Sequence, residues 1–408
     1  MCRQEGFVVF LMCLSLVFCR GKEYSRDVPF SICRHAHESA RVMMRKEDIK
    51  MKTRTKRLAH KLLGLILVTL LTAALAGTAA VFAEDGGEAE DMAPNSKAAI
   101  LYEATTGTVL YEKNADMQLP PASMTKVMTA ILVLEQNPDL EGELTVSKDA
   151  VRHYYCSSME PQRHLEEGEV ISYEECMKYL LIPSGNEAAT AFAFDMCDEY
   201  SDFIAMMNEK AEELGCENTH FADCIGLASN NHYTTPRDMV KICEYAMQFD
   251  KFRECVGQGE GMVPASNVRD EGFAYETTNY VKFPDDRYES PYSQYMTGVK
   301  TGYTPAAGWC FAGCMEKDDL VFYSVVMGGE LLDYSDGERV VQGDFLDTIN
   351  MYSLTDGLTP DNIEEKYPPE EASKLWIVCA AVVLAVAIGL WFSVTRKKRK
   401  YIQEESER

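Results

Sequence analysis

The hydrophobic and polar positions in the central part of the chain predict strands near both of its ends and helices between them. Two short apolar runs, 98–102 and 108–111, are separated by a polar turn, so we expect a hairpin. Later runs predict further strands over 295–301, 308–315 and 320–327. Longer segments without helix breakers predict helices over 124–135, 174–182, 187–214 and 235–249. This order predicts an α+β domain in which both ends form one antiparallel sheet flanked by helices, with a helical lobe inserted between them.

An apolar run over 62–82 has the flanks of a secretory signal. It follows a basic stretch and ends at small residues just before a cluster of acidic ones. We therefore expect a signal peptide over 51–83, with an uncleaved anchor as the alternative. Residues 1–50 precede this signal and Met51 would be a natural start, so an N-terminal extension with a role and one without a role both stay open.

A second apolar run, 375–394, carries no charge over 20 residues, and a basic cluster follows it. Its length suits the core of a bilayer, and the basic cluster suits the cytoplasmic side. We expect a transmembrane helix at 375–394, a stalk over 355–374 and a cytoplasmic tail over 395–408. The central domain, 97–354 after an acidic linker at 84–96, would then be anchored to the cell membrane on its extracytoplasmic side.

The charge of the chain follows the same division. Residues 84–395 hold 55 acidic and only 20 basic side chains. A surface of this kind repels phosphate backbones, which argues against a nucleic-acid partner. Hydrophobic residues make up 46% of the chain and aromatic residues 10%, which is enough for a sizeable core and unlike the composition of a disordered protein.

Nine of the 14 cysteines lie between Cys156 and Cys314, which is an odd number, and they show no regular spacing. We expect most of them to be free, buried thiols that pack as small apolar residues instead of forming a disulfide framework. No His or Cys pair has the spacing of a metal site, so the sequence predicts neither a metal nor an organic cofactor.

The candidate chemistry lies in three motifs that follow one another along the chain: Ser123-Met124-Thr125-Lys126, Ser184-Gly185-Asn186 and Lys300-Thr301-Gly302. A serine hydroxyl is a weak nucleophile unless a base removes its proton. Ser123 and Lys126 lie three residues apart at the start of a predicted helix, so their side chains can meet. Burial, or a nearby cation such as Lys300, would lower the pKa of the lysine and let it act as that base.

The second motif suits proton transfer and positioning. Ser184 could relay a proton between the lysine and a leaving group, and Asn186 offers both a donor and an acceptor for Lys126 and a substrate amide. Another Ser-x-Asn sequence lies at 229–231 in a polar loop. We prefer Ser184 because it lies at a corner between two predicted helices.

The third motif suits substrate binding. Lys300 and Thr301, at the edge of a strand, offer a cation and a hydroxyl group for a substrate carboxylate. Backbone N–H groups at Ser123 and on the strand after Gly302 could form an oxyanion hole.

These motifs and their surroundings resemble the serine-type D-alanyl-D-alanine carboxypeptidases, the low-molecular-mass penicillin-binding proteins. The similar stretches are 100–126, 180–194, 232–239 and 296–313. The resemblance implies a β-lactamase/transpeptidase-like fold, with Ser123 as the acyl-ester nucleophile, Lys126 as its proton acceptor and Lys300 as a substrate-binding lysine. It also implies release of the terminal D-alanine from peptidoglycan stem peptides through an acyl-enzyme, an intermediate that β-lactams would trap.

The chain departs from this family pattern at its C-terminal side. Many members carry a β-rich domain before their anchor, whereas only about 40 residues separate Leu332 from Lys374 here. His232 and Arg237 lie in one of the similar stretches. A substrate contact and an ordinary helix-capping segment are both open for them, so we leave them out of the catalytic set.

Three alternatives share parts of this pattern. A class A-like β-lactamase would need a glutamate-activated water, and its second motif usually reads Ser-Asp-Asn, whereas Gly185 stands in the middle here. A D,D-endopeptidase or transpeptidase of the same fold is compatible with all three motifs. A catalytically idle, membrane-tethered penicillin-binding sensor belongs to another class, and the presence of Ser123, Lys126, Ser184 and Lys300 argues against it.

Overall fold

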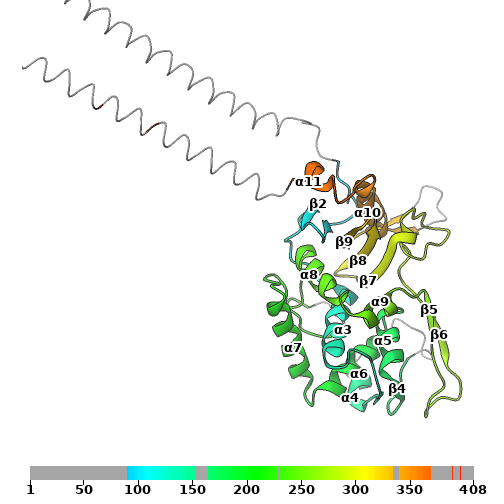
Figure 1. The fold of residues 1–408 in the computed structure, drawn as a ribbon. Helices are drawn as coiled ribbons and strands as arrows, with labels where there is room; N and C mark the ends of the chain where they lie inside the picture. Colours follow the sequence, from blue (N-terminus) through cyan, green and yellow to red (C-terminus); the bar gives the residue numbers. More distant parts are fainter. Residues whose placement is uncertain are drawn as a thin grey trace, which may run out of the picture. The chain divides into compact units, whose positions relative to one another are not determined.

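Figure 1 shows the computed structural model, which describes residues 90–152, 164–227, 229–333 and 340–368 and the single positions 388 and 396. Within these residues, no helix is both long and apolar enough to cross a membrane. Several predicted segments lie outside the described residues apart from those two positions. They are the N-terminal extension 1–50, the signal peptide 51–83, the transmembrane helix 375–394 and the cytoplasmic tail 395–408.

A five-stranded antiparallel sheet joins the two ends of the domain. Its strands are β1 (Ala98–Glu103), β2 (Thr108–Lys113), β7 (Met296–Thr304), β8 (Gly308–Lys317) and β9 (Leu320–Gly329). The strand order is β2-β1-β9-β8-β7, and the central pair β1 and β9 places Ala98 opposite Met327. The predicted antiparallel sheet built from both ends is therefore confirmed, and β7 is one of its edge strands.

The chain between the two halves of the sheet folds into a helical lobe (Figure 1). The 3₁₀ turn η1 (Ala122–Met124) leads directly into α3 (Thr125–Gln136), whose first ten residues are all buried. A helix that is buried on every side belongs at the centre of its layer. The other helices of the lobe are α4 (Lys148–Arg152), α5 (Tyr173–Leu181), α6 (Asn186–Met196), α7 (Tyr200–Glu213), α8 (Pro236–Ala246) and α9 (Asp250–Val256).

One predicted helix is divided in two. The sequence predicts a single helix over 187–214, but α6 ends at Met196 and α7 begins at Tyr200. Cys197 and Glu199 have extended backbones, with φ of −135° and −113°. Cysteine and aspartate are weak helix formers, so the Cys197-Asp198-Glu199 segment readily leaves the helix.

Three small hairpins were not predicted from the sequence. They are β3 (Glu143–Thr145) with β4 (Val170–Ser172), β5 (Glu260–Val263) with β6 (Phe273–Glu276), and β10 (Leu331–Asp333) with β11 (Val340–Gln342). Strands of three or four residues are too short to show an alternating pattern. A buried ion pair holds one of them in place, because Arg269 in the β5–β6 loop binds both carboxylate oxygens of Glu169 at 2.7 Å.

The domain extends beyond the predicted boundaries at both ends. The sheet is followed by α10 (Gly343–Tyr352), η3 (Ser353–Thr355) and α11 (Ile363–Lys366), and η2 (Ser293–Tyr295) precedes β7. Leu358 and Ile363 are buried in the same cluster as α10, so the first part of the predicted stalk, 355–374, packs on the domain. Ala93 of the predicted linker is buried there too. The burial of these apolar side chains holds parts of the predicted linker and stalk against the domain, although prolines and acidic residues in both segments predicted exposure.

The two faces of the sheet support two cores. Along β8, Cys310, Ala312 and Cys314 belong to the core shared with the helical lobe, whereas Phe311 and Met315 belong to the core under α10. Side chains alternate between the faces of a strand, so burial on both faces explains why β8 reads as an almost continuous apolar run. Figure 1 shows α10 on one side of the sheet and the lobe on the other.

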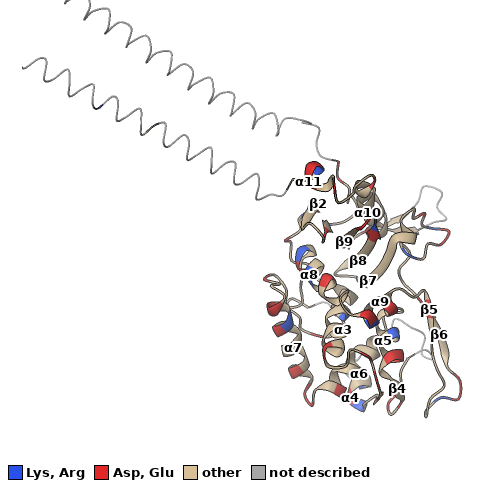
Figure 2. Ribbon diagram, viewed as in Figure 1, with Lys and Arg blue, Asp and Glu red and all other residues tan. Residues whose placement is uncertain are grey.

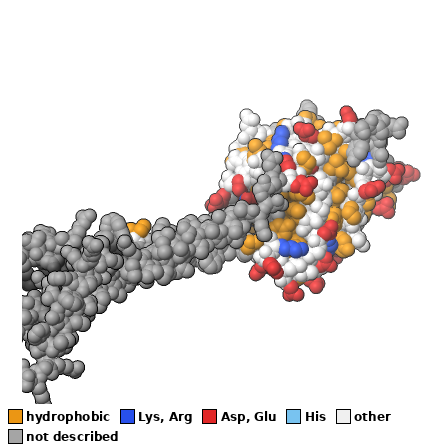
Figure 3. Space-filling view, turned by 90° about the horizontal axis from the view of Figure 1, so that it is seen from above, with side chains coloured by type: hydrophobic (Ala, Val, Ile, Leu, Met, Phe, Trp, Pro, Cys, Tyr) orange, Lys and Arg blue, Asp and Glu red, His pale blue; other side chains and the backbone are white. Residues whose placement is uncertain are grey.

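Charged side chains lie mainly on the outside of the domain. Figure 2 shows acidic segments along α7 and around α9, whereas α3 carries only Lys126 and Glu135. The face in Figure 3 shows scattered acidic groups with a few basic ones between hydrophobic areas. The eight cysteines among the described residues are all free, and seven are buried, with Cys197 half-buried.

Candidate active site

The structure brings the three predicted motifs together from different elements. Ser123 lies in η1, Lys126 in the first turn of α3, and Ser184 and Asn186 at the corner between α5 and α6. The Lys300-Thr301-Gly302 motif lies on β7, which packs beside η1. The other Ser-x-Asn sequence, 229–231, is exposed and contributes no hydrogen bond to Lys126 among the described contacts.

Lys126 is the centre of the cluster. Its Nζ donates hydrogen bonds to Ser123 Oγ at 2.9 Å and to Ser184 Oγ at 3.2 Å. It also donates to Asn186 Oδ1 and, at 3.4 Å, to the carbonyl oxygen of Ile225. The lysine therefore joins the candidate nucleophile to the second motif through direct contacts.

Burial makes the neutral form of Lys126 more accessible than that of an exposed lysine. The side chain has no exposed surface, and burial lowers the pKa of Lys126 to about 8, although nearby Cys224, Glu187 and Asp223 oppose this shift. Burial also lowers the pKa of Lys300 well below its usual value, and the charge of Lys126 adds to that effect. The pKa lowered by burial leaves Lys126 available as a base near neutral pH.

Unusual backbone conformations position the two serines. Ala122, just before the nucleophile, has φ of 49°, and Ser184 has φ of 72°. Non-glycine residues rarely adopt this left-handed region, which costs about 1–3 kcal/mol where the fold enforces it. These conformations direct the hydroxyl groups of Ser123 and Ser184 toward Lys126. The hydrophobic periodicity of the sequence gives no sign of them.

Two glycines allow other segments to approach the nucleophile. A Cβ on Gly226, whose φ is 97°, would lie 1.8 Å from the carbonyl oxygen of Ala122. A Cβ on Gly302 would lie 3.0 Å from the backbone nitrogen of Ser123. The glycine of the third motif therefore lets β7 run directly past the Ser123 backbone, as an oxyanion hole shared by the two segments requires.

The third motif lines the edge of the sheet. Lys300 is only 2% exposed, and its Nζ donates a hydrogen bond to the Thr301 carbonyl oxygen at 3.1 Å. The hydroxyl group of Thr301 is hydrogen-bonded to that of Thr278. Among the described residues, no strand pairs with the outer edge of β7, so its backbone groups there can bind an extended peptide.

Gly185 has no room for a side chain. A Cβ at this position would lie 2.4 Å from a ring carbon of Tyr179 and 2.8 Å from the Tyr179 carbonyl oxygen. The Ser-Asp-Asn form of the second motif therefore does not fit this corner. The geometry agrees with the sequence argument against a class A-like β-lactamase.

Sequence reasoning missed several residues that surround Lys126. Glu187 follows Asn186, is 4% exposed, and has its pKa raised by burial. Its Oε1 lies 4.0 Å from His164 Nδ1. Ile225 contributes a backbone carbonyl oxygen, and such a contact leaves no signal in the residue type. Within the described ranges, no group of three or more His, Cys, Asp or Glu side chains is arranged to hold a metal ion.

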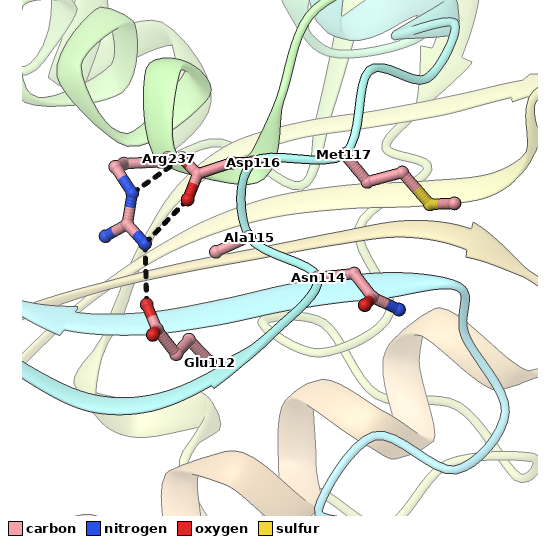
Figure 4. A pocket seen from close by; sticks show the side chains of 6 residues that line it. All are labelled: Glu112, Asn114, Ala115, Asp116, Met117 and Arg237. Carbon is pink, nitrogen blue, oxygen red and sulfur yellow. Dashed lines mark hydrogen bonds and ion pairs between the residues drawn. The ribbon is translucent and has the colours of Figure 1, made fainter.

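Arg237 lies in a separate pocket of about 330 Å³ (Figure 4). Its guanidinium group binds Asp116 at 2.8 Å and Glu112 at 2.6 Å. The pocket is lined by Glu112, Asn114, Ala115, Asp116, Met117 and Arg237, and none of them belongs to the three motifs. Arg237 is neutralised at the surface, which agrees with its omission from the catalytic set.

The sheet, the helical lobe and the serine–lysine cluster together define a penicillin-binding, transpeptidase-like fold. Residues 86–330 match the family model described as D-alanyl-D-alanine carboxypeptidase. This match covers more than half of the chain, and the chain belongs to that family.

Known relatives place the chain in the same group. It is 33% identical over 272 residues to the D-alanyl-D-alanine carboxypeptidase DacF of Bacillus subtilis, covering 66% of this chain and 65% of that one. It is 34% identical over 220 residues to the D-alanyl-D-alanine carboxypeptidase of Streptomyces sp. strain K15, covering 50% of this chain and 71% of that one. The match thus spans slightly less than two thirds of the length of DacF.

A solved structure has the same fold. The crystal structure of the Streptomyces K15 DD-transpeptidase is similar to this chain with a TM-score of 0.56 and 25% sequence identity. The similarity covers 65% of this chain and 98% of that one. The expected α+β fold is confirmed by this likeness.

Proposed function

We propose that the protein is a serine-type D-Ala-D-Ala carboxypeptidase that removes the terminal D-alanine from peptidoglycan stem peptides. The observation that carries this proposal is the position of Lys126, which is fully buried and hydrogen-bonded to the hydroxyl groups of Ser123 and Ser184. Membership of the carboxypeptidase family supports the same reaction.

The cluster can carry out acylation as follows. Neutral Lys126 accepts the Ser123 proton while Ser123 Oγ attacks the carbonyl carbon between the two D-alanines. Ser184, 3.2 Å from Lys126 Nζ, relays a proton to the leaving nitrogen as the C–N bond breaks. Free D-alanine leaves, and an ester joins the remaining peptide to Ser123. Attack by water, with Lys126 again accepting a proton, breaks the ester and restores the serine.

The substrate groups have matching partners. An extended stem peptide would lie along the outer edge of β7, with its carbonyl oxygen near the backbone nitrogens of Ser123 and Tyr303. Its terminal carboxylate would face Thr301 and Lys300. Because an opposite charge favours the charged form of a lysine, substrate binding would raise the lowered pKa of Lys300 and recruit a proton to it.

Release of D-alanine tests the proposal directly. The full chain, in detergent, is incubated with a stem pentapeptide, and free D-alanine is measured alongside the same reaction with Ser123→Ala. We expect release by the unaltered chain and none above background by the variant. Formation of crosslinked peptide dimers without D-alanine hydrolysis, or cleavage of such dimers, would favour the transpeptidase or endopeptidase alternative.

We further propose that the domain is exported and anchored to the cell membrane by the helix predicted at 375–394. The support is the apolar sequence of that segment, its basic flank and the signal-like segment 51–83. The test compares the full chain with a variant that ends at Lys374, in cell fractions prepared without detergent. We expect the full chain in the membrane fraction and the shortened chain outside it, and equal distribution would contradict the anchor.

A further inference from the structure

His232 is a buried residue of the family-like stretch that the mechanism above leaves unused. Only 1% of it is exposed, and it lies between the first turn of α3 and the turn formed by residues 222–227. The ring packs edge-on against Phe221, with the ring centroids 5.8 Å apart. A buried imidazole needs a partner for each nitrogen, and the two partners define its role.

The contacts of His232 determine its tautomer. Its Nδ1 lies 3.0 Å from the backbone nitrogen of Ala222. A backbone N–H can only donate, so Nδ1 is the acceptor and the ring proton lies on Nε2. Nε2 then donates to the hydroxyl oxygen of Thr125 at 2.8 Å. Thr125 lies inside the Ser123–Lys126 motif and is itself fully buried.

The 222–227 turn touches both ends of that motif. Asp223 Oδ1 accepts hydrogen bonds from the N–H groups of Ile225 at 2.8 Å and Gly226 at 2.6 Å, which gives the turn its shape. The carbonyl oxygen of Ile225 accepts from Lys126 Nζ at 3.4 Å. Gly226 packs directly against the backbone of Ala122, the residue before the nucleophile.

We propose that neutral His232 is a positioning residue that clamps the first turn of α3 to the 222–227 turn and thereby holds Ser123 and Lys126 in register. The inference rests on the proposed function because it concerns the same serine–lysine pair. The imidazole does not touch the substrate. It acts through Thr125 on one side and through Ala222 on the other.

Protonation would open this clamp. A proton on Nδ1 would point at the Ala222 N–H, so an attractive contact would become a repulsive one. Burial lowers the pKa of His232, and His220 adds to the effect, whereas Asp223, with Oδ2 3.7 Å from Nδ1, opposes it. Thr125 and Phe221, the other groups that face the ring, carry no charge. The neutral clamp is therefore the normal state at neutral pH.

The test measures the rate of acylation of the full chain by a fluorescent penicillin as a function of pH. Protonation of Lys126 alone makes the logarithm of the rate fall with a slope of about one below pH 8. We expect the slope to approach two once His232 is protonated as well. In His232→Gln, which keeps the donor to Thr125, and in His232→Asn, which keeps the acceptor for Ala222, the slope should stay near one.

The size of the change in acylation rate distinguishes a positioning role of His232 from a role in packing alone. At pH 8.5 we expect His232→Ala to acylate up to about 100-fold more slowly, the loss typical of a small misplacement of reacting groups. Thr125→Val should slow acylation as well, and the double variant Thr125→Val/His232→Gln should lose less than the two single losses combined. His220→Asn is the matched control, since the His220 side chain bonds the Asn231 carbonyl oxygen, outside the clamp. The slope should still approach two in this variant, beginning at a slightly higher pH because the charge of His220 no longer lowers the pKa of His232.

Several outcomes would overturn the inference. They are a slope of two that persists in His232→Gln and His232→Asn, independent effects in the Thr125 cycle, and an unaltered rate in folded His232→Ala. Melting curves at each pH show whether a variant is folded, and the conservative Gln and Asn variants stand in if the Ala variant is not. Normal acylation without D-alanine release would contradict the proposed carboxypeptidase activity alone, whereas absence of acylation in the unaltered chain would contradict both.

Discussion

Lys126 has no exposed surface, and its Nζ is surrounded by oxygen acceptors from Ser123, Ser184, Asn186 and Ile225. The sequence predicted the first three partners: Ser123 from its spacing to Lys126 at a helix start, and Ser184 and Asn186 from the chemistry of the second motif. It did not predict Ile225, because a backbone carbonyl oxygen is present at every residue. Nor did it predict the left-handed conformations of Ala122 and Ser184, which tertiary contacts impose on ordinary residues.

Replacing the base without removing its charge tests the role of Lys126. A guanidinium group stays protonated, so Lys126→Arg cannot accept the Ser123 proton. We expect acylation by a fluorescent penicillin at pH 8.5 to fall by about 10²–10⁴-fold, and Ser123→Ala to abolish the covalent band. Lys178→Arg, on α5 in ion pairs with Glu174 and Glu175, is a control that should keep the normal rate. Normal labelling of Lys126→Arg would contradict the assignment.

The lack of space for a side chain at Gly185 leads to a second prediction. An aspartate here would drive its Cβ into the Tyr179 ring, and overpacking of this kind costs about 1–3 kcal/mol. We expect Gly185→Asp to lower the melting temperature by several degrees, with no gain in penicillin turnover. Calorimetry and penicillin hydrolysis measure the two effects. A variant that melts normally and deacylates penicillin rapidly would show that the corner accommodates the Ser-Asp-Asn form.

The larger elements were predicted better than the small ones. Strand pairs near 98–111 and 296–329 carry long apolar patterns, so their sheet followed from the sequence. The β5–β6 hairpin did not, since what holds it is the ion pair between Arg269 and Glu169, a hundred residues apart. Likewise, the split between α6 and α7 depends on the weak helix formers Cys197 and Asp198, and a periodic pattern runs across them.

The element α10 brings a buried carboxyl group against the sheet. Asp344, in its first turn, is 1% exposed, and burial raises its pKa to about 7. An unfolded chain would have an aspartate pKa near its ordinary value, about 3.9. The folded state thus binds the Asp344 proton more tightly than the unfolded chain does. The contribution of this carboxyl group to stability is complete below about pH 4 and is lost as pH rises through about 7.

Asp344→Asn should remove this pH dependence. The amide stays neutral, so we expect the variant to be more stable than the unaltered chain at pH 8, by up to about 4 kcal/mol, and the advantage to shrink toward pH 5. Denaturant unfolding at both pH values measures the difference. Asp361→Asn, on the exposed side, is the control. An advantage that is equal at pH 5 and pH 8 would contradict the raised pKa.

The whole molecule is a family member whose domain was predicted from its motifs, and side chains just outside the predicted limits are buried with it. Ala93, Leu358 and Ile363 are buried outside the predicted boundaries of 97 and 354. Isolated apolar residues within acidic or proline-containing segments are weak signals, because their burial depends on a surface that only the complete fold supplies. The predicted membrane and signal segments lie outside the described residues and stay predictions.

The burial of the free cysteines predicts how the whole domain reacts with alkylating reagents. All eight described thiols are free, and burial raises the pKa of Cys216, Cys224, Cys255 and Cys310 to about 12. Buried neutral thiols react slowly. We expect alkylation of the unreduced chain to be slow in the native state and complete for these eight after denaturation, as counted by peptide mass spectrometry. Sites that react only after reduction would indicate disulfides instead.

The pairing of β1 with β9 has a consequence for folding during synthesis. The ribosome makes the chain from its N-terminus, so more than two hundred residues are added after β1 before its partner β9 is present. Ser123 is made early and β7 late, which means that the reactive centre cannot be assembled on a partly completed chain. Contacts between such distant segments also make folding slow. A partly synthesised chain would thus hold Ser123 without the β7 strand that packs beside it.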